Sequence, residues 1–523
     1  MSRPLQRFHG GIHPQERKER TRDSSIVTIS PPEKITVILN QGIGGTNRPV
    51  VSVGDHVKRG ERLSKCFNPI SVPVHSPCDG VVSAIEKRPF PHPSGMNTLA
   101  IIIQRNEKDL TSSPNYHDTT VESSSRLQEI IGGLSLEELV SNIRTGGVIG
   151  LGGAGFPTAV KIRKGEQLPI KTLIINGMEC EPCITCDDRL MRERPEEIIR
   201  GIEIIDHLLH PEEIMIGIED NKPEAVQAMK AAAADSRSNI EVIAAPTLYP
   251  SGGEKQLIKI LTGKEVPSGG LSYDISILCQ NVATTYAIYH AALELPLTQR
   301  IVTVTGNGVE RAGNYEIPLG TAVDDILQLC GVTDKDVQIT VGGPMMGFPL
   351  HDSSSPITKT VNCLIVEKST LLQPKPQQRS CIRCAACSDV CPAQLLPQQL
   401  YWAAQSRDFD QTEELNLFDC IECGCCNHVC PSHIPLVEYY RHAKGVLRTQ
   451  QSEKQKADRA RNRHEFRDAR LLHEKEEKAR KLAKKRAALK AKGKQSGSKG
   501  GDKKEAIRAA IERAKAKRRQ REE

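Results

Sequence analysis

Two stretches of the chain repeat one cysteine pattern: CIRCAACSDVCP at residues 381–392 and CIECGCCNHVCP at residues 420–431. Both read C-x2-C-x2-C-x3-C-P. In this pattern the first three thiolates of a stretch ligate one [4Fe–4S] cluster, and the fourth, before the proline, ligates the cluster of the other stretch. The sequence therefore predicts two [4Fe–4S] clusters with crossed ligand sets. The sets are Cys381, Cys384 and Cys387 with Cys430, and Cys420, Cys423 and Cys426 with Cys391.

Other uses of cysteine fit this spacing less well. Zinc sites combine two C-x2-C pairs or add histidines, and disulfide frameworks belong to small secreted domains. Cys425 lies inside the second stretch but off its spacing, so we expect a small packed thiol there. Iron–sulfur clusters carry single electrons. The rest of the chain is therefore expected to supply electrons to the cluster pair or to take them away.

The charge of the chain is unevenly distributed. The 523 residues, enough for three or four domains, carry a net charge of +7. Residues 451–523 hold 27 Lys and Arg against 12 Asp and Glu, which leaves 44 against 52 in the rest. The tail is rich in Ala, Lys, Arg and Glu, which predicts a solvated helix or a disordered arm. A tail that binds anionic lipid or RNA is the more specific alternative. The small number of aromatic residues argues against sequence-specific recognition of nucleic acid.

The sequence also indicates a compartment. The first residues lack the apolar core of a signal peptide, and no run of 18 apolar residues would span a membrane. Seventeen cysteines without such a signal indicate a reducing compartment and metal ligation. We therefore expect a chain that is soluble or peripheral to a membrane, on its cytoplasmic side.

The order of patterns predicts a multidomain fold that combines α/β and β domains. Short β segments split by glycine indicate a small barrel or sandwich, and alternating strands and helices indicate an α/β domain. The first β region resembles biotinyl- and lipoyl-type barrel-sandwich domains, but Lys65 is not in the setting of their modified lysine, and Cys66 and Cys78 are expected to be packed. The expected parts are a polar N-terminal arm (1–34), the barrel-sandwich (35–106), a linker (107–127), the α/β domain (130–295), a second β-rich domain (298–366), the cluster domain (372–445) and the basic tail (446–523).

A glycine-rich stretch, GLGGAGFPTAVK at residues 150–161, is the second informative motif. Its glycines let the backbone approach a ligand and leave N–H groups for phosphate. It matches the weak G-x-G-x-x-G dinucleotide fingerprint but follows no clear strand, so a plain tight turn is an alternative. The stretch resembles the flavin loop, G-R-G-G-A-G-F-P-T-x-x-K-W, of the NADH-binding flavoprotein subunit of respiratory complex I. Leu151 replaces the arginine and Ile162 the tryptophan. The resemblance implies that Gly152, Gly153, Gly155, Phe156 and Lys161 bind FMN and nucleotide.

Three later segments continue this resemblance. A buried strand in TLIINGMECEP, residues 172–182, ends at polar residues, where open α/β sheets bind ligands. The complex I flavoprotein has N-A-D-E-S-E-P here, and Met178 replaces an acid. The resemblance implies that Asn176 holds the flavin and that Phe156 and Glu181 contact NADH. The other residues of the implied cofactor site are Glu179, Glu254 in the glycine turn 249–255, and Asn281 and Thr284 in QNVATT at 280–285. Asn281 could equally be only a helix cap.

Other cysteines and histidines are weaker candidates for metal ligands. Cys180, Cys183 and Cys186 lie three apart but lack a fourth ligand, so we do not expect a third cluster. His9 and His13 are expected at the surface rather than as ligands.

From FHGGIHP at residues 8–14 to about residue 445, the order of segments resembles the C subunit of the Rnf-type electron transport complex of bacteria. The resemblance implies a β-grasp domain at residues 298–366 and a peripheral subunit on the cytoplasmic face of the inner membrane. Its implied partners are integral-membrane and flavin-carrying subunits, NADH and ferredoxin. Electrons would pass between NADH, FMN and the two [4Fe–4S] clusters, coupled to ion translocation, and no catalytic acid or base is implied.

Two other functions remain open from the sequence. One is a soluble flavin and iron–sulfur reductase of the same architecture, similar to the cobalamin reductases of bacterial microcompartments. The other is an electron-relay subunit that binds partners but has lost its nucleotide site, since Leu151 and Met178 depart from the flavoprotein pattern.

Overall fold

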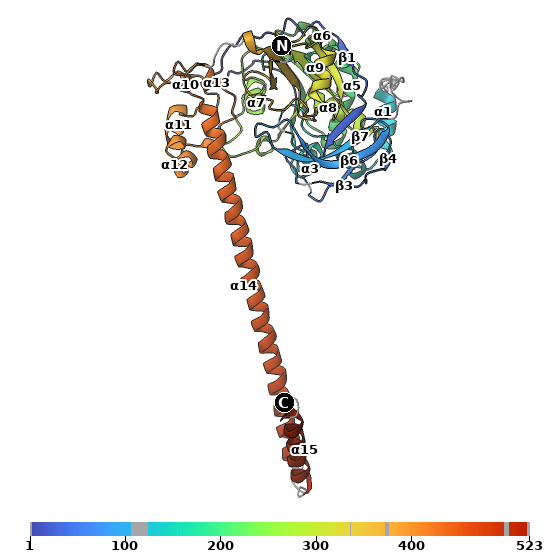
Figure 1. The fold of residues 1–523 in the computed structure, drawn as a ribbon, viewed down its shortest axis with the longest axis vertical. Coiled ribbons are helices and arrows are strands. Elements are labelled where there is room, and N and C mark those ends of the chain that lie inside the picture. The colour runs from blue at the N-terminus through green and yellow to red at the C-terminus, as the bar shows by residue number, and fades with distance from the viewer. Residues whose placement is uncertain are drawn as a thin grey trace. The chain divides into compact units, whose positions relative to one another are not determined.

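The computed structural model describes residues 3–45, 47–68, 70–105, 124–153, 155–334, 336–371, 376–495 and 502–519 (Figure 1). The expected linker at 107–127 lies largely outside these residues. The chain divides into two compact units, Met1–Lys444 and Gly445–Glu523. The described residues of the first unit form three larger sheets and one two-stranded sheet, which match the expected fold class.

A four-stranded antiparallel sheet builds the barrel-sandwich. Its strands in spatial order are β2 (Lys34–Ile38), β7 (Asn97–Gln104), β6 (Gly80–Pro89) and β4 (His56–Val57), with β3 (Arg48–Pro49) and β5 (Ser64–Lys65) paired beside it. Aliphatic side chains such as Ile35 and Val37 alternate into one core with Ile101 and Ile103 of the neighbouring strand. This alternation is the strand periodicity that the sequence predicts.

A parallel four-stranded sheet forms the centre of the α/β domain. Its order is β10 (Ile240–Ala245), β9 (Glu213–Glu219), β8 (Thr172–Gly177) and β11 (Ile277–Asn281). Parallel sheets are covered on both faces, and successive residues of β8 show this. Leu173 and Ile175 pack in one core with α5 (Pro195–Leu209) and α8 (Val282–Ala292), whereas Ile174 packs in another with α7 (Glu254–Thr262). The carboxyl ends of the strands therefore share one edge, where Asn176 pairs with Asn281.

Further helices of this domain precede or flank the sheet. They are α1 (Ser124–Gly132), α2 (Leu136–Thr145), α3 (Thr158–Gln167), α4 (Cys186–Glu193) and α6 (Pro223–Ala234), with a 3-10 turn at Ser272–Ile275. A capping box starts α2: Ser135 accepts from the Glu138 N–H, and the Glu138 carboxylate accepts from the Ser135 N–H at 2.8 Å.

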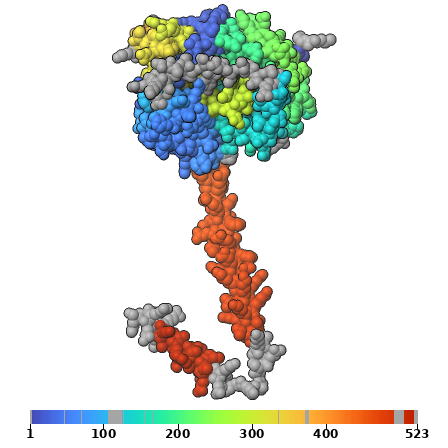
Figure 2. Space-filling view, turned by 90° about the vertical axis from the view of Figure 1, so that its right-hand side faces the viewer, coloured from blue at the N-terminus to red at the C-terminus, as the bar shows by residue number. Residues whose placement is uncertain are grey.

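The third sheet has the β-grasp strands and one addition. Its order is β1 (Ile26–Thr28), β13 (Gly313–Pro318), β12 (Gln299–Thr305), β16 (Cys363–Lys368), β14 (Val337–Val341) and β15 (Phe348–Pro349), covered by α9 (Val323–Leu329). The edge strand β1 comes from the N-terminal arm, which is therefore more than the polar extended segment expected. Figure 2 shows the residues of this arm, in dark blue, between the yellow β-grasp residues and the green residues of the α/β domain.

The cluster domain shows its internal repeat in the backbone. Residues with positive φ recur at equivalent places of the two cysteine stretches: Arg383 and Glu422, Ala385 and Gly424, Gln394 and His433. A short helix follows the second pair in each stretch. The helices are α10 (Ala386–Asp389), α11 (Pro397–Gln405), α12 (Phe409–Glu414) and α13 (Cys425–His428), with 3-10 turns at Ser369–Leu371 and Leu417–Asp419.

The second unit is helical where it is described. Helix α14 (Leu436–Gln495) starts before the expected tail boundary at residue 446 and continues without a break, and α15 is Asp502–Arg519. From Arg448 onward the described side chains are nearly all exposed. None of the described helices is long and apolar enough to cross a bilayer.

Lys359 is a fully buried amine at a junction of three domains. Its Nζ donates to the carbonyl of Pro73 at 3.0 Å and of Gly147 at 2.6 Å, which belong to the barrel-sandwich and the α/β domain. Burial lowers the pKa of this amine to about 7. A neutral amine still has two N–H donors, enough for both carbonyls.

This lysine should make stability depend on pH. The unfolded lysine titrates near 10.5 and the folded one near 7, so between these values the unfolded chain binds the extra proton. Stability should rise with pH across this window by up to ~1.4 kcal/mol per unit, and not below it. We expect the thermal midpoint of the wild type to rise relative to that of Lys359→Met between pH 7 and pH 9. A constant difference between the two proteins would contradict a neutral Lys359.

Candidate functional site

A cavity of about 850 Å³ lies at the carboxyl edge of the parallel sheet. Its wall includes the glycine stretch, the ends of β8 and β11, the turn before α7, the turn between β14 and β15, and Ile421 with Cys423 of the cluster domain. Of the eleven residues expected to bind FMN or nucleotide, ten contribute to this wall. Gly155 does not, but a Cβ on it would lie 3.1 Å from Thr360, which does. The fold thus brings segments from three domains around one space.

The glycine stretch is a loop between two helices. It runs from α2 to α3, with no strand before it, so it is not the start of a dinucleotide-binding βαβ unit. The Gly150 N–H donates to the Phe156 carbonyl at 2.7 Å, and the Gly155 N–H donates back to the Gly150 carbonyl at 3.2 Å. Gly153 and Gly155 have φ of +128° and +62°, which favour glycine. Pro157 is the N-cap of α3.

Asn281 and Thr284 hold this loop from behind. The Asn281 carboxamide oxygen caps α8 by accepting from the N–H groups of Ala283 and Thr284, and its NH₂ donates to Asp187 at 2.7 Å. The Thr284 hydroxyl oxygen accepts from the Leu151 N–H at 2.8 Å. A Cβ on Gly152 would lie 3.1 Å from the Asn281 Cβ, so the loop packs tightly on this cap.

Lys161 and Glu254, both expected to bind cofactor, pair with each other on the wall. The Lys161 ammonium lies 3.1 Å from a Glu254 carboxylate oxygen and also donates to the Cys279 carbonyl. Glu254 also accepts from the Ser272 hydroxyl at 2.7 Å. The pair joins α3 to α7 and leaves this part of the wall nearly neutral.

The residues after β8 are also engaged by the protein. The Asn176 amide donates to the Gly252 carbonyl at 2.8 Å. The Glu179 carboxylate accepts from the N–H groups of Asp187 and Asp188, and burial raises the pKa of both Glu179 and Asp187. Sequence reasoning missed Asp187, because an acidic residue at the start of α4 is an ordinary helix feature.

Glu181 fastens the β-grasp domain to the cavity. Its carboxylate accepts from the backbone N–H groups of Met345 at 2.7 Å and Met346 at 3.0 Å. A Cβ on Gly343 would overlap the Glu181 side chain, at 2.0 Å from its Cγ, so this turn requires glycine there. Glu181 was expected to contact a nucleotide, whereas here it holds the turn that closes one side of the cavity.

Two buried polar atoms in the cavity wall lack a protein partner. They are the Thr158 hydroxyl in the first turn of α3 and the Gln256 carboxamide oxygen in α7. Neither helix has a side-chain cap at its N-terminus. Free N–H groups and the helix dipole at such ends favour an anionic ligand such as phosphate.

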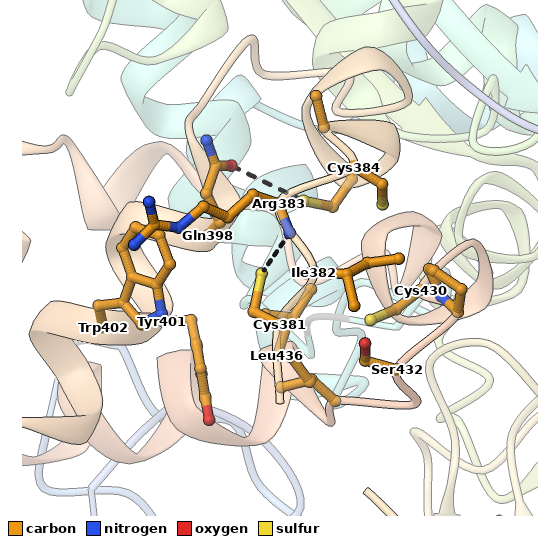
Figure 3. Close-up of a pocket in the computed structure, with 14 residues that line it drawn as sticks. Cys381, Ile382, Arg383, Cys384, Gln398, Tyr401, Trp402, Cys430, Ser432 and Leu436 are labelled. Atoms are coloured by element: carbon orange, nitrogen blue, oxygen red, sulfur yellow. Dashed lines mark hydrogen bonds between the residues drawn. The ribbon is translucent and has the colours of Figure 1, made fainter. Parts of the chain in front are cut away.

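The first cysteine set surrounds a cavity of about 290 Å³, which we call the far cradle. Cys381, Cys384, Cys387 and Cys430 line it, together with Trp402 and others. Figure 3 shows Cys381, Cys384 and Cys430 around this space, with the Arg383 guanidinium beside the Trp402 ring at 5.3 Å. The backbone N–H of Arg383 donates to the Cys381 sulfur at 3.4 Å.

The second set lies closer to the large cavity. Cys391, Cys420, Cys423 and Cys426 line a smaller space that we call the near cradle, and Cys425 and Tyr440 also line it. Cys423 lines both the near cradle and the large cavity. The Tyr249 hydroxyl, on the cavity wall, donates to the Cys423 carbonyl at 2.7 Å. Cys425 is fully buried in an apolar cluster with Ile12 and Tyr249.

The remaining cysteine triplet is not gathered in one place. Cys180 lines the large cavity and accepts from the Gly252 N–H at 3.2 Å, whereas Cys183 and Cys186 pack with Cys363 of the β-grasp domain. Cys78 is buried as expected, and Cys66 is only half-buried.

Comparison with known proteins gives four family models along the chain. They are an RnfC barrel sandwich hybrid domain (residues 6–108), a Nuo51 FMN-binding domain (143–290), an SLBB domain (301–349) and a 4Fe-4S dicluster domain (380–434). An NAD⁺-reducing [NiFe]-hydrogenase in the H₂-reduced state is a structural neighbour, with a TM-score of 0.47, 18% identity, and coverage of 60% of this chain and 63% of that chain.

Curated relatives share one description, that of the C subunit of an ion-translocating oxidoreductase complex. The protein of Pectobacterium atrosepticum is 44% identical over 98% of this chain and 70% of its own length. The Klebsiella pneumoniae protein is 43% identical, with 98% and 65% covered, and the Haemophilus influenzae protein 44%, with 90% and 69%. This chain thus spans about two thirds of their length.

The chain belongs to the family formed by the C subunits of ion-translocating oxidoreductase complexes. The expected family, the multidomain fold class and the cofactor types, FMN and [4Fe–4S] clusters, are confirmed. The unpartnered Thr158 and Gln256 atoms, the glycine backbone and the two uncapped helix ends fit FMN in the large cavity. The four thiols that line the far cradle, and the four in the near cradle that have the ferredoxin spacing, fit two [4Fe–4S] clusters.

The first prediction on this site concerns Thr284. Thr284→Val keeps the side-chain volume but leaves the buried Leu151 N–H unpaired, a cost of about 1–3 kcal/mol. The loop should then hold FMN more weakly, and we expect the FMN dissociation constant to rise roughly tenfold, measured by flavin fluorescence.

Thr285→Val is the matched control for this measurement. Its hydroxyl is equally buried but donates only to the Asn281 carbonyl within the helix, at 3.0 Å. Equal effects of the two substitutions would show that the Thr284 contact does not support the loop.

The second prediction separates cluster ligands from a packed thiol. Cys387→Ser should remove iron from one cradle, lowering the content from about eight irons per chain toward about four. Cys425→Ala should keep all eight, because Cys425 packs against Ile12 and Tyr249. Iron and sulfide analysis of anaerobically purified chains measures both. Loss of iron in Cys425→Ala at normal solubility would contradict the assigned ligand sets.

Proposed function

We propose that the chain is a peripheral subunit that passes electrons between NADH and membrane partners of an ion-translocating complex. FMN would occupy the large cavity, and the clusters the two cradles. FMN, when bound, exchanges electron pairs with a nicotinamide and single electrons with an iron–sulfur cluster. The observation that supports this path best is Cys423, which lines both the cavity and the near cradle.

The protein groups have definable tasks in this proposal. The glycine loop supplies backbone N–H groups at close range, and the starts of α3 and α7 offer N–H groups and the Thr158 hydroxyl to a phosphate. Lys161 is paired with Glu254, so its task here is to hold the starts of α3 and α7 together rather than to add net charge to the wall. No residue on the wall needs to act as a general acid or base for hydride transfer.

The proposed order of the centres follows from the cradles. The near cradle adjoins the cavity, and the far cradle lies beyond it with Ile382 and Cys384 exposed. Electrons would therefore reach the surface at the far cradle, where integral-membrane and flavin-carrying subunits, or ferredoxin, would meet the chain. The exposed basic tail would contact anionic lipid on the cytoplasmic face of the inner membrane.

One observation favours a second candidate, a relay subunit without NADH activity. Glu181 was expected to contact the nucleotide, but its carboxylate is engaged by the Met345 and Met346 N–H groups. A nucleotide would have to compete with these two hydrogen bonds. A soluble reductase similar to the cobalamin reductases would use the same cavity of this chain, and a test of membrane binding separates it from the first proposal.

Anaerobic titration of the FMN- and cluster-loaded chain separates these functions. NADH should bleach the flavin absorbance, and dithionite should then reduce the remaining centres. Cys387→Ser is the matched control, because the far cradle lies outside the cavity, and its flavin should bleach with NADH as in the wild type. Bleaching by dithionite alone would favour the relay subunit.

A further inference from the structure

The motif FHGGIHP, residues 8–14, has no role in the site as described so far; we call this segment the strap. On one side it contacts the loop that carries a near-cradle ligand. The Gly11 N–H donates to the Val390 carbonyl at 3.0 Å, and His9 Nδ1 donates to the Cys391 carbonyl at 3.0 Å. His9 is exposed, as expected, but its ring is bonded to the backbone of a cluster ligand.

On its other side the strap contacts the cavity wall. Ile12 and Tyr249 exchange two backbone hydrogen bonds, at 2.8 and 3.0 Å. The Ile12 side chain is buried in an apolar cluster with Tyr249, Cys423 and Cys425. Since Tyr249 also donates to the Cys423 carbonyl, the strap, the cavity wall and both near-cradle loops form one packed unit.

Close packing explains the two glycines of the strap. Gly10 has φ +71°, and a Cβ there would lie 2.5 Å from the carbonyl carbon and oxygen of Val390. Gly11 has φ +87°, and its Cβ would lie 3.0 Å from the Leu248 side chain and the Tyr249 carbonyl. Any other residue at Gly10 would have to push the Cys391 loop away.

The strap is fixed at both ends to the α/β domain. Before it, Arg3 forms ion pairs with Glu213 and Glu241, both at 3.2 Å. After it, the Glu16 carbonyl accepts from the Cys183 N–H, and Lys18 donates to the Glu179 carbonyl at 2.6 Å. A segment anchored in this way can resist displacement of the loop that it contacts.

We propose that the strap positions Cys391, and with it the near cradle, against the wall of the large cavity, with His9 as a positioning residue. The cluster domain also contacts the α/β domain through Asp419, which accepts from Ser268 and Gly269 and pairs with Lys255, on the loop of the other near-cradle ligands. The strap gives the near cradle a fixed place relative to the α/β domain. This inference rests on the proposed function, in which the near cradle receives electrons from the cavity.

The test uses the cluster-loaded full chain and two readouts that need no NADH. One is the rate of iron release to a chelator; the other is the EPR spectrum after dithionite reduction. We expect iron release in two phases, one for each cradle. In His9→Ala the phase of the near cradle should become about fivefold faster, which is the factor that one lost hydrogen bond gives. The other phase should keep its rate, and the EPR spectrum should change. His9→Asn places an amide N–H near the position of Nδ1 and should restore both readouts.

Gly10→Ala tests the same idea without removing a hydrogen bond. Its control is Gly54→Ala, which imposes the same strain at φ +96° but meets nothing within 4 Å. Only Gly10→Ala should accelerate iron release. Wild-type rates and spectra in His9→Ala, or equal effects of the two alanine substitutions, would overturn the proposal. Because neither readout involves NADH, failure of NADH to bleach the flavin would overturn the proposed function and leave this test intact.

Discussion

A hydrogen bond from the Tyr249 hydroxyl to the Cys423 carbonyl joins the wall of the large cavity to the ligand loop of the near cradle. Electron transfer between two bound centres requires them to stay close, and the centres here belong to segments of the chain about 170 residues apart. Tyr249 is buried, and burial raises the pKa of its hydroxyl, so it remains a donor at any physiological pH. The β-grasp turn held by Glu181 and the apolar cluster around Cys425 are built around the same contact.

The polar residues near the cavity are used mainly to shape it. Thr284 and Asn176 bond to backbone groups of neighbouring loops, and Asn281 caps α8 and donates to Asp187, so the contribution of these residues to ligand binding is the position of the segments they hold. Such preorganisation lowers the cost of ordering the site when a ligand binds. The groups left for a ligand are backbone N–H groups and a few atoms such as the Thr158 hydroxyl and the Gln256 carboxamide. These are suited to a phosphate-bearing cofactor rather than to acid–base chemistry.

The local sequence pattern was sufficient to predict structure where chemistry fixes the spacing of the residues. The two cysteine stretches determined which thiols share a space, and the aliphatic runs at β8 and β9 determined a parallel sheet with its polar carboxyl edge. Contacts between distant segments left no such signal. Nothing in FHGGIHP shows that Gly10 must fit against Val390, and a lysine at residue 359 reads as a surface residue until three domains are packed around it. The hydrogen bonds of Glu181 to a turn 164 residues away likewise left no signal in the sequence.

The two departures from the flavoprotein pattern share one structural solution. Leu151 and Met178 both turn their side chains into apolar cores, in place of an arginine and an acid. At each position the backbone carbonyl is then held by a buried cation: Arg300 donates to Leu151 at 2.7 Å, and Lys222 donates to Met178 at 2.8 Å. The guanidinium that the pattern places in the loop is thus supplied from β12, behind it. The two cations differ in charge balance, because Lys222 is paired with the buried Glu219 carboxylate, whereas Arg300 donates to the carbonyls of Leu151 and Lys359. The departure at Leu151 therefore keeps a guanidinium at the loop, and the departure at Met178 removes an acid next to a cation that already has a partner.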